Sequence, residues 1–199
     1  MNDRLSAASS LADIVDGARS GDGRAFELLY GLLHRRVYAY ALLRRCPDSE
    51  GLVNDVFLQV FTNIARFEGG EAQFRAWLFT IARNKMIDQT RRLNRRPQEV
   101  ALDDALSERL VSDEQVEREA IGRVANGALF EQLSVLTPEQ RDVVLLRVVS
   151  DLTVEGVAEV LGKRPGAVKG LQRRALRTLA RNISGGDRTL ADRSDVPSG

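Results

Sequence analysis

The stretch from Leu152 to Arg181 constrains the fold more than any other part of the chain. It holds two helical patterns separated by Gly162, and Thr153 stands where the first helix needs an N-terminal cap. The second pattern begins near Pro165, and proline is favoured in the first turn of a helix. A short helix, a turn with glycine and a second helix form a helix-turn-helix, which we predict here.

The second helix of this motif combines an apolar stripe with a cationic remainder. Residues 163–181 contain seven Lys or Arg residues and no Asp or Glu. A solvated helix face usually mixes both signs, because opposite charges four residues apart stabilise it. A uniform charge of +7 instead favours phosphate, so we predict that this helix binds DNA. The apolar stripe consists of Val168, Leu171, Ala175 and Leu179.

The composition excludes several classes of function. With 199 residues and 43% apolar content, the chain can form two small domains. Cys46 is the single cysteine and His34 the single histidine, so we expect no disulfide, metal, cofactor or catalytic triad, and predict no catalytic residue. The chain shows no signal-peptide core and no apolar run of bilayer length. We therefore expect a cytoplasmic protein with no membrane contact.

Helical periodicity runs through the N-terminal half. The third helix carries more apolar residues than one buried face requires, so it is either central to a bundle or meets another protein. The fourth helix becomes cationic beyond residue 81, and residues 81–97 hold six basic residues and one acidic residue. The predicted helices span about 11–18, 24–45 and 49–67, with the fourth starting near Phe74 after Gly69-Gly70.

The segment 98–120 reverses the sign of the charge, with eight acidic and two basic residues. Its composition is typical of a flexible linker. It is either a solubilising spacer or an acidic strand that occupies a basic channel or covers a DNA-binding patch. Beyond it we predict a helix over 121–136 and another from Thr137, which forms a capping box with Gln140.

No segment has the period of a strand, and no glycine-rich phosphate loop is present. We predict an all-α fold of two small helical domains joined by a flexible acidic linker. The predicted parts are an N-terminal tail with a short helix (1–21), a first domain (22–97), the linker (98–120), a second domain (121–183) and a disordered tail (184–199).

Three motifs follow one another along the chain. Residues 74–88 are FRAWLFTIARNKMID, residues 136–141 are LTPEQR and residues 166–169 are GAVK. With these motifs the chain resembles a bacterial sigma factor of the extracytoplasmic-function (ECF) group of the sigma-70 family. The resemblance covers the two predicted domains, which would be conserved regions 2 and 4. It implies a promoter-specificity subunit without catalysis of its own, with RNA polymerase core and promoter DNA as partners.

The resemblance also implies which residues contact each partner. The polymerase core would meet the helix through Leu52, Asn54, Asp55, Phe57 and Leu58. The opened minus-10 element would be held by loop residues Glu68 and Gln73 and, along its phosphates, by Arg83, Asn84, Lys85, Arg91 and Arg92. The minus-35 duplex would be contacted by Lys163, Arg164, Lys169, Gln172 and Arg173.

Two features depart from the family pattern. In the core-binding helix Gly51 replaces an acidic residue, while Asn54 and Asp55 stand for Gln and Glu. In the DNA-binding helix residues 170–172 are Gly-Leu-Gln where many members carry Ser-Arg-Leu, so the promoter preference does not transfer. Trp77 has the spacing of a core residue, which favours packing over a role as a base-stacking wedge.

Two other functions compete with this interpretation. A dimeric helix-turn-helix repressor or activator would also bind duplex DNA, but it does not need the second cationic segment at residues 83–96. A purely structural helical adaptor would leave the +7 helix unexplained. Within the sigma-factor interpretation, the family and the apolar surface of the first domain both favour an anti-sigma factor as a further partner.

Overall fold

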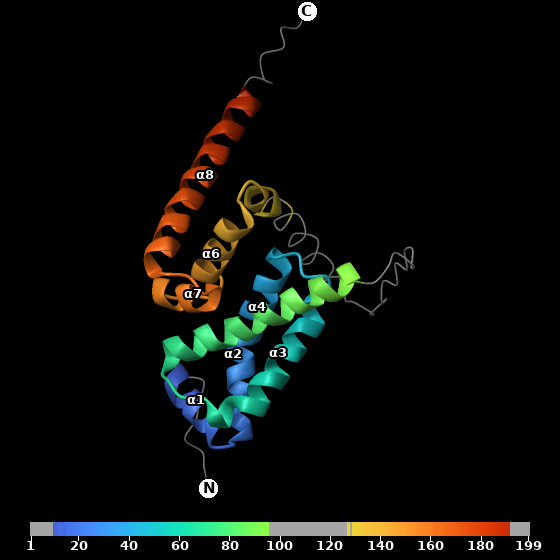
Figure 1. Cartoon of the computed structure of the whole chain (residues 1–199), viewed down its shortest axis with the longest axis vertical. Coiled ribbons are helices and arrows are strands. Elements are labelled where there is room, and N and C mark those ends of the chain that lie inside the picture. The colour runs from blue at the N-terminus through green and yellow to red at the C-terminus, as the bar shows by residue number, and fades with distance from the viewer. Residues whose placement is uncertain (1–9, 96–126, 128, 192–199) are drawn as a thin grey trace, which may run out of the picture. The chain divides into compact units, whose positions relative to one another are not determined.

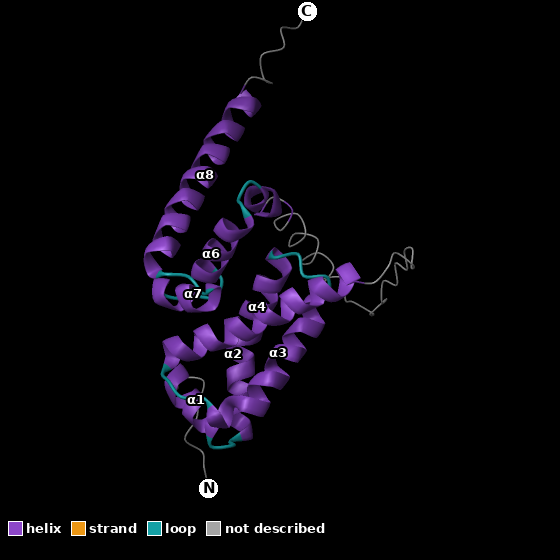
Figure 2. Ribbon diagram, in the orientation of Figure 1, coloured by secondary structure: helices purple, strands orange, loops and turns teal. Residues whose placement is uncertain are grey.

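The computed structural model describes residues 10–95, 127 and 129–191. Within these residues the chain is helical or connects helices, and no strand occurs (Figures 1 and 2), which confirms the predicted all-α class. No helix of the described part is both long and apolar enough to cross a bilayer. The helices are α1 (Leu11–Arg19), α2 (Gly23–Leu43), α3 (Ser49–Asn63), the 3-10 helix η1 (Ile64–Arg66), α4 (Glu71–Arg95), α6 (Pro138–Val148), α7 (Val154–Leu161) and α8 (Pro165–Ala191).

Helices α1 to α4 form a bundle. Helix α2 contacts α1 and α3, and α3 contacts α4. Tyr40, Phe74 and Phe79 are the largest fully buried side chains, and the rings of Tyr40 and Phe79 meet edge to face at 5.6 Å. Burial raises the pKa of the Tyr40 hydroxyl, so the side chain stays neutral.

Helix α1 belongs to this bundle and not to a loose tail. It contacts α2, η1 and α4, and its buried side chains lie on one stripe. Ser10 and Asp13 form a reciprocal capping box at its start, which fixes where the helix begins. The buried residues of α1 are Leu11, Ile14, Val15 and Ala18.

The predicted third helix is interrupted earlier than its periodicity suggested. Helix α3 ends at Asn63, and η1 adds one tighter turn. Thr62 and Asn63 donate side-chain hydrogen bonds to the carbonyl oxygens of Leu58 and Gln59 at 2.8 Å, and such local bonds compete with regular helix continuation.

The C-terminal helix-turn-helix has the predicted ends. Thr153 Oγ1 accepts a hydrogen bond from the Gly156 N–H at 3.0 Å, which caps α7. Gly162 ends α7 at φ 61° and ψ 36°, a left-handed conformation that glycine adopts without strain. Helix α6 starts at the predicted capping box, in which Thr137 and Gln140 exchange two side-chain to backbone hydrogen bonds.

The apolar stripe of α8 is mostly as predicted. Val168, Leu171 and Ala175 are buried, and Leu179 is half-buried. On α6, Val148 is 75% exposed, whereas Leu145 is buried. The buried positions of α6 cluster on one side of the helix, and Val148 lies outside that side because each residue advances about 100°.

The disordered tail was predicted to begin at residue 184, which is too early. Helix α8 continues to Ala191, so residues 184–191 are helical. Gly185 and Gly186 weaken a helix by about 1 kcal/mol each, but they do not break it as proline does, and the next proline is Pro197. The predicted linker at 98–120 lies outside the described residues, as do residues 1–9 and 192–199.

Candidate nucleic-acid interfaces

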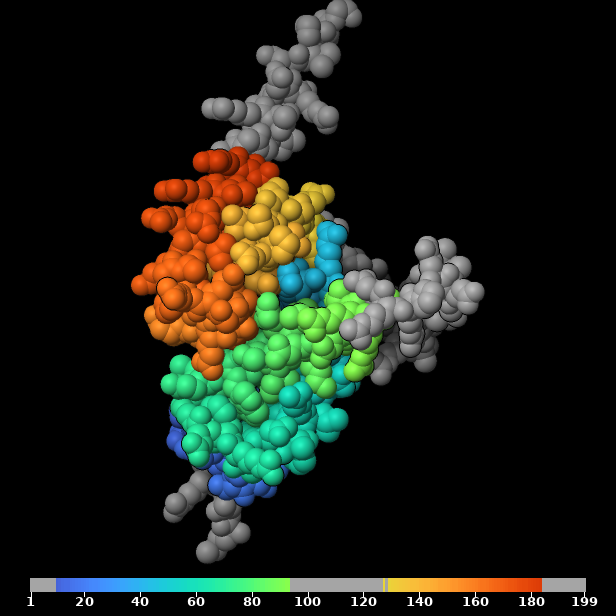
Figure 3. Space-filling view, viewed as in Figure 1, coloured from blue at the N-terminus to red at the C-terminus, as the bar shows by residue number. Residues whose placement is uncertain are grey.

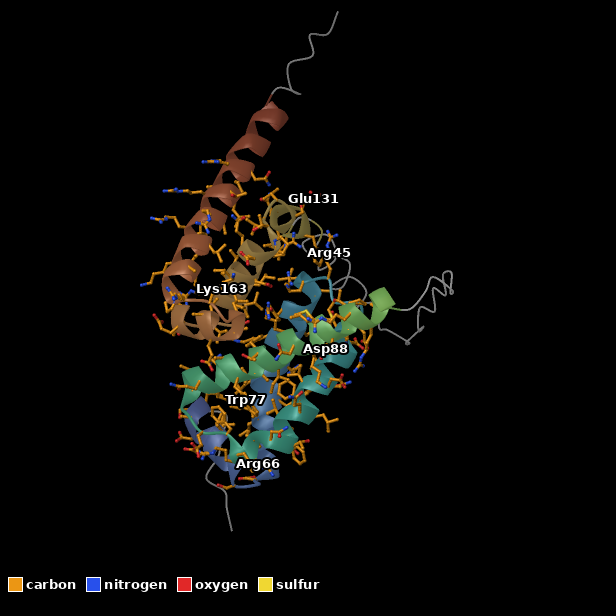
Figure 4. The ribbon with its side chains drawn as sticks, viewed as in Figure 1. Arg45, Arg66, Trp77, Asp88, Glu131 and Lys163 are labelled. Carbon is orange, nitrogen blue, oxygen red and sulfur yellow. The ribbon has the colours of Figure 1, made fainter. Side chains whose placement is uncertain are left out.

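The predicted minus-35 residues lie at the start of α8 and in the turn before it. Arg164, Lys169 and Arg173 are exposed, whereas Lys163 and Gln172 are half-buried. Lys169 and Arg173 are four residues apart and therefore share one face. Figure 4 shows Lys163 at this end and nitrogen-tipped side chains along α8, which forms a continuous exposed strip in Figure 3.

Among the described residues, no carboxylate forms an ion pair with Arg164, Lys169 or Arg173. Gly166 and Ala167 are exposed in the first turn, and a side chain added at Gly166 would meet open space. The amide end of α8 is therefore accessible to a phosphate group, and the surface as a whole suits a polyanion.

The loop between η1 and α4 borders a pocket. Phe67 stacks on Trp77 with ring centroids 5.2 Å apart and 25° between planes. Gln73 Oε1 accepts a hydrogen bond from the Gly70 N–H at 3.2 Å, which ties the loop to the start of α4. Figure 4 shows Arg66 and Trp77 at this end of α4. The residues of this loop and the adjoining helices that line the pocket are Asn63, Arg66, Phe67, Glu68, Gln73 and Trp77.

The shape of this loop requires glycine at position 69. Gly69 has φ 140°, and a Cβ there would lie 2.8 Å from Gln73 Cβ. The fixed loop places the predicted Glu68 and Gln73 beside two aromatic rings, which is a suitable environment for an unstacked base. Asn63, Arg66 and Phe67 also line the pocket and were not among the predicted residues, although an aromatic residue two positions before a pair of glycines was a usable signal.

Trp77 packs in the bundle as its spacing predicted, and its ring also borders the loop pocket. Its side chain is half-buried and contacts Phe74, which is fully buried, at 5.7 Å between centroids. It also lines the loop pocket. The ring therefore packs against the bundle on one side and borders the loop pocket on the other.

The five predicted minus-10 residues of α4 do not form one surface. Arg83, Asn84 and Arg91 lie within about 100° of one another around the helix, whereas Lys85 lies about 200° from Arg83. Lys85 Nζ is 3.9 Å from Asp55 Oδ2 on α3. Arg92 is exposed and lies about 180° from Arg83, on the same side of α4 as Lys85. Only Arg83, Asn84 and Arg91 of the five therefore lie on one side of α4.

The predicted core-polymerase residues are divided by burial. Leu52 and Phe57 are 0% and 4% exposed, so we correct their assignment from contact residues to core residues. Asn54, Asp55 and Leu58 are exposed. Phe61, which was not predicted as a contact, is 61% exposed beside Leu58 on the same helix. Helix α3 therefore carries both a buried face and an exposed apolar face.

The departure from the family pattern at Gly51 has a structural cause. The Asp48 carboxylate caps α3, and its Oδ1 accepts a hydrogen bond from the Gly51 N–H at 2.7 Å. A Cβ at position 51 would lie 2.0 Å from Asp48 Oδ2. Any larger residue at position 51 would displace the Asp48 cap. Asp48 itself supplies a carboxylate close to the position where the family often has an acidic residue.

The cysteine and the histidine do not form a reactive site. Burial raises the pKa of the Cys46 thiol, so it stays protonated. His34 Nδ1 is 2.9 Å from the carbonyl oxygen of Tyr30, and the two rings stack at 4.9 Å. The described residues contain no cluster of His, Cys, Asp and Glu that could hold a metal ion.

Comparison with known proteins agrees with this arrangement. A model of Sigma-70 region 2 matches residues 26–96, and a model of Sigma-70, region 4, matches residues 127–179. The chain is 34% identical to the ECF RNA polymerase sigma factor BldN of Streptomyces coelicolor, over 87% of this chain and 66% of BldN. It therefore spans just under two thirds of that relative.

Two further similarities cover nearly the whole of the other protein. The ECF RNA polymerase sigma factor ShbA of Streptomyces griseus is 31% identical, over 83% of this chain and 91% of ShbA. The structure of CnrH in complex with the cytosolic domain of CnrY has a TM-score of 0.63 and 25% identity, covering 88% of this chain and 99% of CnrH. The chain belongs to the extracytoplasmic-function group of the sigma-70 family.

Proposed function

We propose that this chain directs bacterial RNA polymerase core to a set of promoters in the cytoplasm and has no catalysis of its own. Residues 22–97 would bind the core and the minus-10 element, and residues 121–183 would bind the minus-35 element. The linker 98–120 would connect the two sites. The reaction chemistry would remain with the polymerase.

The observation that carries this proposal is the pocket beside Phe67 and Trp77 at the start of the cationic helix α4. An unstacked base can enter a pocket with aromatic walls, and its phosphates can follow cations such as Arg83 and Arg91. A duplex-binding repressor needs no such pocket. The pocket lies at the start of α4 and not on the DNA-binding helix α8. This separation favours a factor that holds an opened DNA strand.

The minus-35 contact would be made by the first turns of α8 in the major groove. Lys169 and Arg173 present long cationic side chains on one face, and such side chains can reach guanine O6 and N7. Arg164, which is exposed in the turn, would contact phosphate. Lys163 and Gln172, both half-buried, would contribute at the edge of this surface.

The core polymerase would bind the exposed side of α3. Asn54 and Asp55 offer polar groups there, and Leu58 is 65% exposed. With Phe61 these residues form an apolar surface with a polar rim, which is common at protein interfaces. The same surface is suited to an anti-sigma factor, and the similar protein CnrH was solved with CnrY bound.

The proposal is tested by adding the purified chain to sigma-free core polymerase and promoter DNA. We expect a transcript that starts at one position and depends on both promoter elements. Retained binding to duplex DNA with no transcript would support the repressor alternative instead.

A matched pair of variants separates core binding from DNA binding. Leu58→Glu should abolish co-purification with the core while leaving binding to duplex minus-35 DNA unchanged, because α8 is untouched. Leu32→Glu makes the same change at a 49%-exposed position on α2 and serves as the control. Equal core binding by both variants would contradict the assignment of α3.

A further inference from the structure

Two helices of the helix-turn-helix domain contact the N-terminal bundle. Helix α7 and residues 142–148 of α6 belong to the same compact unit as α1 to α4, and α7 contacts α4. Two ion pairs join these elements. Arg44 Nε at the end of α2 is 2.8 Å from Asp142 Oδ1, and Arg36 Nη1 is 3.7 Å from Asp151 Oδ2. The contact therefore combines helix packing with opposite charges on its two sides.

Helix α7 is buried on more sides than one partner requires. At about 100° per residue, its buried positions cover an arc of about 200°. A surface helix that packs on one core needs an apolar stripe about 100° wide. A second partner therefore covers part of α7, and α4 is in contact with it. The buried residues of α7 are Gly156, Val157, Ala158 and Val160.

The ion pair between Arg44 and Asp142 is mostly buried. The side chain of Arg44 is 24% exposed and that of Asp142 is 10% exposed. Burial raises the pKa of the Tyr40 hydroxyl, and the Asp142 carboxylate raises it further, so Asp142 lies close to the core of the bundle. Such a pair adds little net stability, because both ions regain water when they separate. The contact can therefore open at low cost.

This contact brings carboxylates to both features that would hold an opened strand. Arg44 lines a pocket of about 240 Å³ together with Arg83, one of the predicted minus-10 residues, and Asp142 lies beside Arg44. Glu159, which is exposed on α7, lines the aromatic loop pocket at the start of α4. Negative charges at these two places repel the phosphates of a DNA strand.

The same contact cannot persist on a promoter. The minus-10 and minus-35 elements are about 25 base pairs apart, or about 85 Å at about 3.4 Å per base pair. Helix α7 ends at Leu161, and the predicted minus-35 residues begin at Lys163. With those residues in the minus-35 groove, α7 would be far from an α4 that holds the minus-10 strand. The docked arrangement therefore belongs to the free chain.

We propose that docking of α6 and α7 on the bundle is an autoinhibitory contact, in which Asp142 pairs with Arg44 and Glu159 borders the aromatic pocket. The free chain then binds an opened minus-10 strand weakly, and the polymerase core separates the two domains. This inference rests on the proposed function and adds a control of the minus-10 site. The helix-turn-helix domain would exclude the strand with its own carboxylates.

The test uses Arg44→Gln in the full chain without polymerase. The docked state then buries the Asp142 carboxylate without the charge of Arg44, so the domains should separate. Affinity for a single-stranded minus-10 oligonucleotide should rise about tenfold, as the open fraction rises from about one tenth to nearly all chains. This gain should occur although a positive charge is lost. In the holoenzyme Arg44→Gln should bind like the wild type, because the core has already opened the contact.

A matched control isolates the effect of the contact from that of charge. Arg35→Gln removes the same charge from an exposed position of α2. It should leave the affinity of the free chain for the single strand unchanged or slightly lower, because it only weakens the attraction of phosphate. The two variants should therefore change the affinity in different directions.

A second variant tests the contact without altering a buried residue. Glu159 is exposed, so Glu159→Gln should leave the melting temperature unchanged. Affinity of the free chain for the single strand should rise severalfold, because the carboxylate at the loop pocket is gone. Glu131→Gln makes the same charge change at another exposed position of the second domain and should have a smaller effect.

Spin labels measure the opening itself without DNA. Arg35→Cys and Glu155→Cys place one label on α2 and one on α7, near the exposed ion pair that joins α2 to the turn before α7. Cys46→Ser removes the single native thiol. The free chain should give one short distance between the labels. Addition of Arg44→Gln, or of polymerase core, should lengthen it.

Each other result overturns the inference. A lower affinity of Arg44→Gln for the single strand would assign Arg44 to the DNA contact, and an equal affinity would show that docking does not hinder the strand. Equal effects of Glu159→Gln and Glu131→Gln would exclude a specific role of Glu159. A long distance in the free wild-type chain would exclude docking in solution. Failure of the proposed function would be distinct, because the wild-type holoenzyme itself would bind no minus-10 strand.

Discussion

The cationic faces of α8 and α4 are built in different ways. On α8 the exposed cations Arg164, Lys169 and Arg173 belong to one short stretch of a single helix, and none of them has an ion pair among the described residues. On α4 the cations lie around the helix, and Lys85 and Arg91 have carboxylate neighbours. Residues of α2, α3 and the preceding loop add to the α4 surface.

This difference matches the two forms of DNA that the proposal assigns to them. A straight helix with one accessible face fits the major groove of a duplex, which has a regular shape. An opened strand has no fixed shape, so its site must supply pockets for bases as well as cations for phosphates. The comparison predicts that variants on α8 and on the α4 surface lose binding to different DNA forms.

The largest effect is expected for the double variant Lys169→Glu with Arg173→Glu. Loss of two contacts should cost about 2–6 kcal/mol in binding to duplex minus-35 DNA, since one base-contacting residue contributes about 1–3 kcal/mol. Fluorescence anisotropy with a duplex oligonucleotide measures this. Arg174→Glu with Arg181→Glu makes the same charge change on another side of α8 and should cost less. Equal losses would show that charge alone, and not the face of the helix, determines binding.

The second prediction concerns Trp77→Leu, which keeps an apolar side chain but removes the aromatic wall of the loop pocket. Binding of the holoenzyme to a single-stranded minus-10 oligonucleotide should weaken by about 1–3 kcal/mol, the usual contribution of stacking on one base. Binding to duplex minus-35 DNA should be unchanged. A loss on both DNA forms would break the separation between the two surfaces.

The third prediction addresses the turn before α8. Gly162→Ala places a Cβ at φ 61° and should lower the free energy of unfolding by about 1–2 kcal/mol. Chemical denaturation followed by circular dichroism gives the value. Gly166→Ala, in the first turn of α8 with open space around it, should have little effect or stabilise the helix. If the two variants behaved alike, the left-handed turn would not limit this motif.

A smaller effect is expected for Asp55→Asn, which releases Lys85 from its carboxylate neighbour. The pair is exposed, so stability should change by at most about 1 kcal/mol. Once released, Lys85 can contact phosphate, and the salt dependence of binding to opened DNA should become steeper. Asp16→Asn, which releases Arg19 from its carboxylate neighbour on α1, is the control. An unchanged slope for Asp55→Asn would show that Lys85 faces away from the strand.

The smallest expected effect is on the reactivity of Cys46. Nearby arginines usually lower the pKa of a thiol, but burial raises it here, so iodoacetamide should react more slowly at pH 8 than with a free thiol. The raised pKa stabilises the fold fully below about pH 8.5, the pKa in the unfolded chain, and this contribution is lost as pH rises through the folded value. If Cys46 reacted faster than a free thiol, the nearby guanidinium groups would lower its pKa by more than burial raises it.

Local signals in the sequence determined the helix-turn-helix. Thr153, Gly162 and the pair Thr137 and Gln140 act on backbone groups within a few residues, so their effect does not depend on distant parts of the chain. The cationic face of α8 follows from the same local periodicity, because one helix supplies both its buried stripe and its exposed side.

Tertiary structure decided the features that depend on two or more elements. Periodicity could not show that Leu52 and Phe57 are buried while Leu58 is exposed, because the whole of α3 is rich in apolar residues. It could not bring Arg45 to Arg83, or Lys85 to Asp55, across about forty and thirty residues of sequence. Helix ends and stripes are set by neighbours along the chain, whereas pockets and ion pairs between helices are set by which faces pack together.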